Sequence, residues 1–353
     1  MPGPPPDLND LLARAHVVRL PLAVRFRGLD EREALLLDGP AGWGEFAPFA
    51  EYGDAESARW LAAAVEAGWD GDPPPAVRDR VPVNATVPAV PAGRVPDVLA
   101  RFDGCRTAKV KVAEPGQALA DDVARVAAVR DVLGPGGRIR VDANGAWSVD
   151  DAVRALTARA RHGREYAAQP CAGLDDLRAL RVALARAGVD VPVAADESVR
   201  KADDPLRVVA AGAADVVVLK VAPLGGVRAA LEVARVLGVP VVVSSALDTS
   251  VGLAAGVRLA AALPELPFDC GLGTASLLAA DVTRAPLRPV DGALPVTTVV
   301  ADPALLAAHA VPGPSRDRWL RRLERCHALL AASAGDAGDA GDAGGVVARS
   351  ARA

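Results

Sequence analysis

The sequence predicts a (β/α)8 barrel of the TIM type with a smaller α+β capping domain attached to it. From about residue 81 onward, eight short β-branched runs recur roughly every 25 to 30 residues, separated by Ala-, Arg- and Leu-rich segments of helical period. The chain has 353 residues, 51% of them apolar, which is enough for one large core and one appendage. Lysines and carboxylates stand at the ends of several runs, where barrel enzymes carry their active sites.

The barrel is placed at residues 81–285 by the order of these runs. They are VPVNATV from Val81, TAKVKVA from Thr107, RIRVDANG from Arg138, REYAAQP from Arg164, VPVAADES from Val191, DVVVLKVAP from Asp215, VPVVVSSALD from Val239 and PFDCGLGT from Pro267. Intervening segments have apolar residues at three- and four-residue spacing, as in VRAALEVARVLG from Val227, which predicts helices between the strands.

The flanking regions have a different organisation. Residues 1–80 contain strand-like runs and then a helical stretch, ESARWLAAAVEAG from Glu56, which predicts the separate α+β cap. Residues 286–330 begin with a further β-like segment that we expect to return to the cap. The tail, 331–353, repeats GDA and is predicted to be disordered.

Charge and cysteine content limit the possible partners. The net charge of -4 arises from 44 acidic and 40 basic residues spread along the chain, so neither a nucleic-acid surface nor a polybasic membrane patch is indicated. The four cysteines form no CxxC pair, and no leader or membrane-spanning run is evident. These features predict a cytoplasmic protein that acts on a small molecule, and they leave its oligomeric state open.

Lysine is rare, and its positions suggest chemistry. Of the 40 basic residues 36 are arginine, and lysine occurs only at Lys109, Lys111, Lys201 and Lys220. Lys109 and Lys111 are two apart on one strand and therefore point the same way, and Lys220 ends the sixth run. Unlike arginine, a lysine can lose its proton, and the charge of Lys109 should lower the pKa of Lys111 enough to make it a general base. Lys201 is most simply a solvated loop charge.

Carboxylates end two other runs. Asp142, with Asn144 two residues on, ends the third run, and Asp196 and Glu197 end the fifth. Strand-end carboxylates of this kind can converge on a hard cation, and Mg2+ accepts such ligands while keeping water or substrate oxygens in its other positions. A cation beside a substrate carboxylate would stabilise the enediolate formed when the α-proton leaves.

At these residues the chain resembles the enolase superfamily, specifically its muconate-lactonizing subgroup and, more closely, the o-succinylbenzoate synthase family. The likeness covers roughly residues 15 to 300. It rests on RFRG from Arg25, GWGEFAPFAEY from Gly42, PVNATVPAV from Pro82, KVK from Lys109, DANGAW from Asp142, ADES from Ala195, LKVAPLGG from Leu219, SSALDTSVGLAAG from Ser244 and CGLGTA from Cys270. The resemblance implies an enolase-type barrel and a Mg2+-dependent syn-dehydration of 2-succinyl-6-hydroxy-2,4-cyclohexadiene-1-carboxylate to o-succinylbenzoate in menaquinone biosynthesis.

The resemblance also implies roles for individual residues. Lys111 would remove the proton α to the carboxylate and help the hydroxyl leave, Lys220 would stabilise the enediolate, and Lys109 would contact the substrate carboxylate. The other implied site residues are Asp142 and Asp196 as metal ligands, Asn144 and Glu197 supporting them, Ser244, Ser245, Gly271 and Gly273 on the succinyl side, and Arg27 with the loop from Phe46 to Tyr52 closing the site from the cap.

One position departs from the family pattern. The third metal ligand should be a glutamate ending the fourth strand, in a segment that usually reads EQP, but here it is Ala168. Glu165 and Gln169 lie an odd number of residues away, so strand alternation should point them to the other face. A water could fill the position, the chain could be a non-catalytic relative, or the residue could have been altered. We favour a member of the synthase family with an impaired metal site.

Other activities stay open at this stage. N-succinylamino acid racemases and dipeptide epimerases also use a lysine on each side of the α-carbon, but the epimerases carry Asp-x-Asp on strand eight, where this chain has Asp269 alone. The remaining motifs and residues are predicted to be structural. They are DGPAGWG from Asp38, read as a turn between cap strands, Trp43 and Trp147, which could be core or pocket residues, and His16, His162, His309 and His327.

Overall fold

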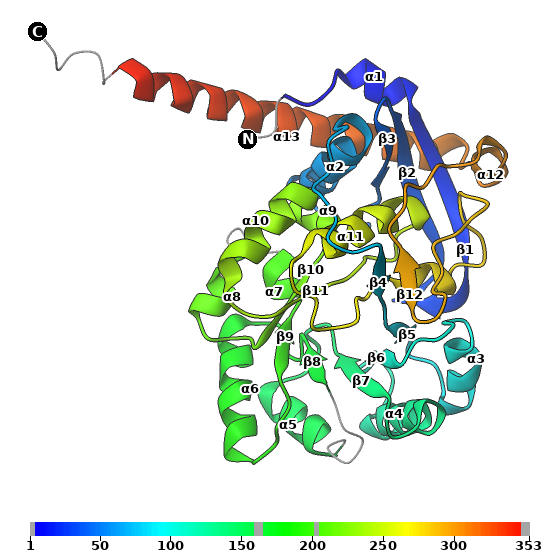
Figure 1. The fold of residues 1–353 in the computed structure, drawn as a ribbon, viewed down its shortest axis with the longest axis vertical. Coiled ribbons are helices and arrows are strands. Elements are labelled where there is room, and N and C mark those ends of the chain that lie inside the picture. The colour runs from blue at the N-terminus through cyan, green and yellow to red at the C-terminus, as the bar shows by residue number, and fades with distance from the viewer. Residues whose placement is uncertain (1–3, 159–164, 201–204, 347–353) are drawn as a thin grey trace, which may run out of the picture.

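Parallel strands form the centre of the barrel (Figure 1). The structure is a computed structural model, and it describes residues 4–158, 165–200 and 205–346. Within the described chain, one sheet contains β5 (Ala85–Val87), β6 (Thr107–Lys111), β7 (Arg138–Asp142), β8 (Tyr166–Ala168), β9 (Val193–Ala195), β10 (Val216–Leu219) and β11 (Val241–Val243), neighbours in that order. Each neighbouring pair is parallel. Parallel neighbours in chain order are what successive βα units produce.

The last predicted strand is shorter than expected. Instead of an eighth strand, Cys270 and Gly271 form single parallel bridges to Val83 and Ser244, and these two bridges join the edges of the sheet. The first predicted run is also divided, because β4 (Arg80–Pro82) pairs elsewhere and only β5 belongs to the barrel. The barrel is therefore the predicted (β/α)8 type, with its closing strand reduced to two residues.

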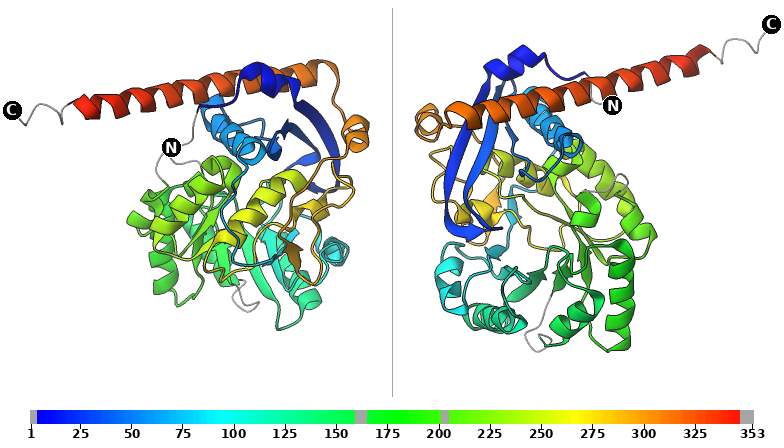
Figure 2. Two further views of the ribbon diagram at one scale, coloured as in Figure 1. Left: turned by 45° about the horizontal axis from the view of Figure 1, so that its top comes forward. Right: turned by 180° about the vertical axis from the view of Figure 1, so that it is seen from behind.

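Helices cover the outside of the barrel (Figures 1 and 2). The helices of this region, which include short ones at the strand ends, are η1 (Ala92–Arg94), α3 (Val95–Leu99), α4 (Leu119–Leu133), α5 (Val149–Ala158), α6 (Leu174–Arg186), α7 (Glu197–Arg200), α8 (Arg207–Ala210), α9 (Val221–Leu224), α10 (Val227–Leu237), α11 (Ser250–Ala262) and η3 (Gly273–Leu277). Their apolar faces are buried at helical spacing, as with Leu177, Leu180 and Leu184 of α6. None of the described helices is long and apolar enough to cross a membrane.

Strand residues alternate between two environments. Ala167, Val193 and Val217 belong to the large core that includes the buried helix faces. Their neighbours form a separate buried cluster of Tyr166, Ala168, Ala194, Val216, Val218 and Val242. Because successive side chains of a strand point to opposite faces, this second cluster lies inside the barrel. A residue two positions after a member of this cluster, such as Asp196 after Ala194, points the same way and lies nearer the carboxyl end of the barrel interior.

The cap consists of three antiparallel strands and a helix. The strands are β1 (Ala15–Phe26), β2 (Leu29–Gly39) and β3 (Gly42–Phe46), and the helix is α2 (Asp54–Trp69). Gly39 and Gly42 pair at the β2–β3 turn, which confirms the reading of DGPAGWG as a turn. A Cβ on Gly39 or Gly44 would collide with a backbone carbonyl of α2, at Gly68 or Ala64. These glycines therefore let α2 pack directly on the strands.

The C-terminal segment lies partly against the barrel and partly against the cap. β12 (Ala293–Pro295) pairs with β4, while α12 (Pro303–Ala308) and α13 (Gly313–Val346) contact the cap strand β1. α13 also packs on α2 and on the short helix α1 (Leu8–Ala13) at the other end of the chain (Figure 2).

The expectation of a disordered tail is wrong for residues 331–346, because α13 continues through them to Val346. A helix already nucleated and docked over its first turns adds further residues at low cost, although the glycines and aspartates of the GDA repeat are weaker helix formers than its alanines. Residues 347–353 lie outside the described chain.

Candidate active site

The paired lysines of β6 point into the barrel at its carboxyl end. Lys109 Nζ lies 3.1 Å and Lys111 Nζ 2.7 Å from the same oxygen, Oδ2 of Asp142, which is directly opposite Lys111 in the register of β6 and β7. Lys111 also donates to Asn144 Oδ1 at 2.6 Å. Two positive charges thus share one fully buried carboxylate.

Asn144 and Glu197 are linked to this cluster by hydrogen bonds, and their predicted support of metal ligands stays a prediction. The backbone N–H of Asn144 donates to Asp142 Oδ1 at 3.2 Å, and its side-chain amide donates to Glu197 Oε1 at 3.0 Å. Asn144 adopts a left-handed backbone with φ of 48°, a conformation that asparagine tolerates better than most residues. The end of β7 is thereby linked to the end of β9.

The third lysine meets the second aspartate. Lys220 follows β10 and donates to both carboxylate oxygens of Asp196, at 2.8 and 2.6 Å. Each of the two side chains is at least nine-tenths buried. The two lysine–aspartate groups come from β6 and β7 on one side and from β9 and β10 on the other, so the interior carries an ammonium group on each flank.

Ala168 stands between these two groups. It pairs with Asp142 of β7 on one side and with Ala194 of β9, two residues before Asp196, on the other. Its side chain belongs to the barrel interior and is 2% exposed. A glutamate at this position would reach toward both aspartates.

The two nearby candidates for a replacement ligand are engaged elsewhere. Glu165 bonds Arg140 Nε at 2.5 Å and lies 3.6 Å from Arg138, so it is held at the beginning of β8 and not at the end where Ala168 lies. Gln169 accepts the backbone N–H groups of Asp196 and Ser198 and donates to the Cys171 carbonyl. Both side chains are therefore unavailable at the position of the missing carboxylate.

Burial and charge shift the pKa values of the cluster in different directions. Burial lowers the pKa of Lys111, Asp142 opposes this, and the neighbouring charge of Lys109 lowers it further, so the net shift is downward. Burial also acts to lower the pKa of Lys109, but the attraction of Asp142 and Asp196 outweighs it, and the net shift is upward. Burial would raise the pKa of Asp142, yet Lys111 and Lys109 hold it well below its usual range. Lys111 is thus the better proton acceptor of the β6 pair.

The carboxylates present fit a divalent cation with two protein ligands. Among the residues that the structure describes, no group of three or more His, Cys, Asp or Glu side chains could hold a metal. Asp142 and Asp196 supply the hard oxygen donors that Mg2+ prefers, and Mg2+ commonly binds through one or two carboxylates and completes its shell with water and substrate oxygens.

The cap approaches the mouth at the β1–β2 turn. Lys111 Nζ lies 5.5 Å from the centre of the Phe26 ring, so this turn covers the base. The next residue, Arg27, stacks on Phe49 at 4.3 Å and pairs with Glu51 at 3.3 Å. Arg27 and the loop from Phe46 to Tyr52 are therefore brought together, and their closing of the site stays a prediction.

The predicted succinyl side is built on β11 and the bridge that closes the barrel. Ser244 lines a pocket with Lys220, and Ser245 Oγ donates to the Gly271 carbonyl at 2.8 Å. A Cβ on Gly271 would collide with Ser244 Oγ, so this position needs glycine. Gly273 instead faces the Asn84 carbonyl and the Phe102 ring, and its predicted contact with substrate stays a prediction.

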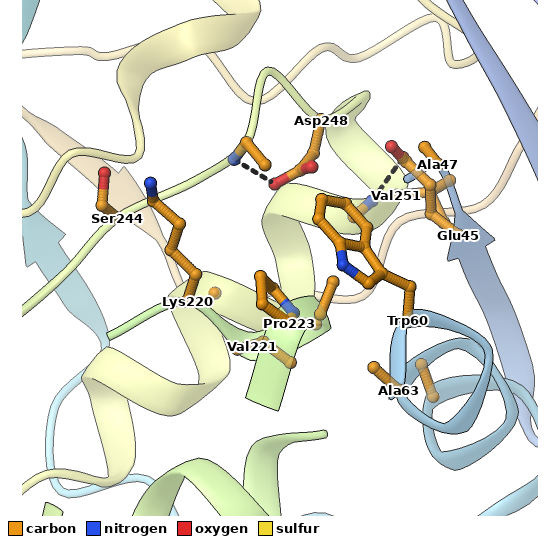
Figure 3. A pocket seen from close by; sticks show the side chains of 16 residues that line it. Glu45, Ala47, Trp60, Ala63, Lys220, Val221, Pro223, Ser244, Asp248 and Val251 are labelled. Atoms are coloured by element: carbon orange, nitrogen blue, oxygen red, sulfur yellow. Dashed lines mark hydrogen bonds between the residues drawn. The ribbon is translucent and has the colours of Figure 1, made fainter. Parts of the chain in front are cut away.

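Three residues of this region, the buried Glu45 and Arg32 and the partly buried Asp248, carried no role in the sequence reading. Asp248 and Glu45 line the pocket beside Lys220, with Trp60 of α2 on the side of the cap (Figure 3). Glu45 accepts the Thr249 hydroxyl at 2.6 Å and the Gly252 N–H at 3.0 Å, which attaches the cap strand β3 to the beginning of α11. Arg32 donates to the Leu247 carbonyl at 3.2 Å. Glu45 and Asp248 do occur in motifs quoted above, but motif membership alone gave no function.

Asp269 lies at the opposite end of the barrel. Its carboxylate accepts the Thr107 hydroxyl at 2.5 Å and pairs with Arg138 at 2.7 Å, and these two residues begin β6 and β7. Its position is unsuitable for binding a substrate amine at the mouth. This finding agrees with the absence of the epimerase Asp-x-Asp pattern.

The remaining residues singled out from the sequence make contacts of other kinds. His16 stacks near Trp43, with ring centres 5.6 Å apart, and His327 bonds the Pro6 carbonyl. His309 ends α12, and Trp147 is a partly buried core residue. His162 and Lys201 lie outside the described residues.

The barrel, the cap over its mouth and the lysines inside it define an enolase-type protein. The sequence matches the enolase C-terminal domain-like family over residues 97–300 and the enolase N-terminal domain-like family over residues 17–68. The fold is similar to muconate lactonizing enzyme from Pseudomonas fluorescens, at 22% identity and a TM-score of 0.72, over 84% of this chain and 98% of that one. The fold is also similar to muconate lactonizing enzyme from Pseudomonas putida, at 21% identity and a TM-score of 0.70, again over 84% of this chain and 98% of that one.

Much closer sequence relatives define the family more narrowly. The chain is 60% identical to o-succinylbenzoate synthase of Mycolicibacterium smegmatis, over 92% of this chain and 98% of the relative. It is 57% identical to o-succinylbenzoate synthase of Mycobacterium leprae, over 92% of this chain and 95% of the relative. The chain belongs to the o-succinylbenzoate synthase family.

Proposed function

We propose that the protein dehydrates 2-succinyl-6-hydroxy-2,4-cyclohexadiene-1-carboxylate to o-succinylbenzoate, the reaction that the names of its relatives indicate. The observation that carries the proposal is the placement of Lys111 and Lys220 on opposite flanks of one buried interior, each bonded to an aspartate. A substrate carboxylate placed between them would have a base on one side and a fixed positive charge on the other.

Lys111 is the proton acceptor in this scheme. Its lowered pKa allows the neutral amine to take the proton from the ring carbon that bears the carboxylate. The resulting ammonium, on the same face of the ring, then gives a proton to the neighbouring hydroxyl, which leaves as water. The ring loses one hydrogen and one hydroxyl and becomes aromatic, so the transfer is balanced and needs no external oxidant.

Lys220 and Lys109 act through charge. When the α-proton leaves, negative charge develops on the substrate carboxylate, and Lys220 stabilises it from the far flank. Lys109, with its raised pKa, stays protonated and holds the carboxylate in place. A Mg2+ ion held by Asp142 and Asp196 would add positive charge beside the same carboxylate.

The direct test is a turnover assay with the purified full chain and Mg2+, followed by ultraviolet absorbance. We expect conversion that depends on Mg2+ and that is abolished in Lys111→Arg, because a guanidinium does not give up its proton to act as a base. The same substitution at Lys201, the one lysine with no predicted site role, is the control and should leave turnover unchanged. Undiminished turnover in Lys111→Arg would contradict the proposed base.

Racemisation of N-succinylamino acids is a second candidate, favoured by the presence of a lysine on each flank. A racemase should exchange the α-hydrogen of an N-succinylamino acid for deuterium in D2O. Exchange of one enantiomer should require only the lysine that faces its hydrogen, whereas interconversion of the two enantiomers should require both Lys111 and Lys220. Absence of exchange under conditions that support dehydration would eliminate this activity.

A further inference from the structure

The loop between β3 and α2, residues 47–53, is held from both sides by arginines. The Phe49 ring lies between Arg27 and Arg32, whose guanidinium carbons are each 4.3 Å from the ring centre. Arg32 also donates to the Ala47 carbonyl. Because Arg27 follows the Phe26 ring that covers Lys111, the position of this loop sets the position of the cap over the base.

Arg322 of the C-terminal helix α13 is the further anchor of this loop. Its Nη2 donates to the carbonyls of Phe49 and Tyr52 at 3.0 and 2.6 Å and to Ser57 Oγ at 2.8 Å. Its Nη1 lies 3.3 Å from the Pro48 carbonyl. A planar guanidinium can satisfy several acceptors at once, which an ammonium on a flexible stem cannot do in the same geometry.

The helix that presents Arg322 is itself firmly docked on the cap. Trp319, one turn earlier, is buried, meets Phe46 edge-on with ring centres 5.9 Å apart and donates to Glu33 at 2.8 Å. Leu323 and Cys326 are fully buried. Figure 2 shows this helix running along the cap, so its contacts give Arg322 a fixed support.

The contacts continue from the loop to the succinyl side of the site. Arg32, stacked on Phe49, donates to the carbonyls of Leu247 and Ala246 at 3.2 and 3.5 Å. These two residues directly follow Ser245, in the segment between β11 and α11. Loss of the Arg322 anchor would free the Phe49 loop and, through Arg32, loosen the segment that follows the two serines.

We propose that Arg322 is a positioning residue: by holding residues 47–53 over the mouth, the C-terminal helix sets the affinity of the site for its substrate. The inference rests on the proposed function and deepens it. Arg322 contacts the loop backbone and not the catalytic lysines, so its removal should raise KM and leave the chemical step largely intact.

The test compares Arg322→Ala and Arg322→Lys with Arg325→Ala in the full chain. Arg325 is the matched control, since it lies on the same helix and pairs with Asp54 at 2.7 Å, outside the loop. Steady-state turnover and hydrogen exchange of the amides of residues 47–53 are measured for each protein. We expect Arg322→Ala to raise KM about tenfold, with kcat changed less than about twofold, and to speed exchange in the loop. Arg322→Lys should have a KM and a loop exchange rate between those of Arg322→Ala and the unmodified chain. Arg325→Ala should match the unmodified chain in both measurements.

The two readouts separate failure of this inference from failure of the proposed function. If the unmodified chain neither turns over the substrate nor binds o-succinylbenzoate, the proposed function fails, and loop exchange alone decides whether Arg322 anchors the loop. Unchanged KM and unchanged loop exchange in both Arg322 variants would overturn the positioning role. A fall in kcat with KM unchanged would also overturn it. Should Arg322→Ala not fold, the same criteria apply to Arg322→Lys, which keeps the charge.

Discussion

Replacing Ala168 with glutamate should restore a metal ligand. The position lies inside the barrel, in register with Asp142 and next to the strand that carries Asp196. Three ammonium groups and two aspartates meet there, and these five side chains carry a net charge of +1 (three minus two). A third carboxylate brings this sum to zero and gives the cation another oxygen donor.

The expected gain follows from the role of the missing group. Loss of a residue that only supports a metal ligand commonly costs about 10 to 100-fold in metal affinity or activity. A directly coordinating carboxylate should contribute at least as much, so Ala168→Glu should lower the Kd for Mg2+ by about 10 to 100-fold or more. That range corresponds to about 1.4 to 2.7 kcal/mol of binding free energy.

Titration calorimetry with Mg2+ measures the effect, with Ala168→Gln as the matched control. Glutamine has the same length but no charge, so it separates restored charge from filled space. Circular dichroism melting shows that each variant is folded before Mg2+ is added. Turnover of the cyclohexadiene carboxylate should rise together with metal affinity in the glutamate variant only.

Three results would each contradict part of this reasoning. Equal Mg2+ affinity in folded Ala168→Glu and in the unmodified chain would mean that residue 168 does not face the cation. Tighter Mg2+ binding without any turnover, in a variant whose lysines are unchanged, would instead support a non-catalytic relative. An ordinary enzymatic rate in the unmodified chain would show that Asp142 and Asp196 suffice.

Three further predictions concern charge and packing. Lys220→Met should abolish turnover, measured by ultraviolet absorbance, because it removes the charge on the far flank and leaves Asp196 without its bonded ammonium. Burial, and then the charge of Asp248, raise the pKa of Glu45 to about 8. The folded state therefore keeps a proton that the unfolded chain loses above about pH 4.3, and the free energy of unfolding should fall by up to about 1.4 kcal/mol per pH unit until about pH 8. Glu45→Gln should flatten that slope in denaturant titrations at several pH values. Gly44→Ala should lower the melting temperature, because its Cβ would collide with the Ala64 carbonyl.

The parts of the site predicted from sequence share one physical basis. Residues two apart on a strand point the same way, and the carboxyl ends of parallel strands meet at one mouth. That rule was sufficient to bring Lys111, Asp142, Asp196 and Lys220 together, as the hydrogen bonds show. The assignment of Ala168 to the metal-ligand position came instead from the resemblance, through the segment AAQP that stands where the family has EQP.

The rule does not extend to contacts made by loops and termini. Arg322 meets the loop at Phe49 across more than 270 positions of sequence, and nothing local distinguishes it from the other 35 arginines. The eighth strand was predicted at full length because PFDCGLGT has strand-like composition. In the part of the chain that the structure describes, only Cys270 and Gly271 of this run bridge to neighbouring strands, and a Cβ on Gly271 would collide with Ser244 Oγ.

The bonding of the lysines bears directly on what Ala168 means for the activity. Lys111 is held by Asp142 and Asn144, and Lys220 by Asp196, so none of the three bonds uses the side chain at residue 168. The proton-transfer half of the site can therefore keep its geometry while the cation is held by fewer ligands. A catalyst weakened in this way should gain turnover at higher Mg2+ concentration, because mass action offsets the weaker affinity of a site with two carboxylates, whereas a non-catalytic chain should gain none.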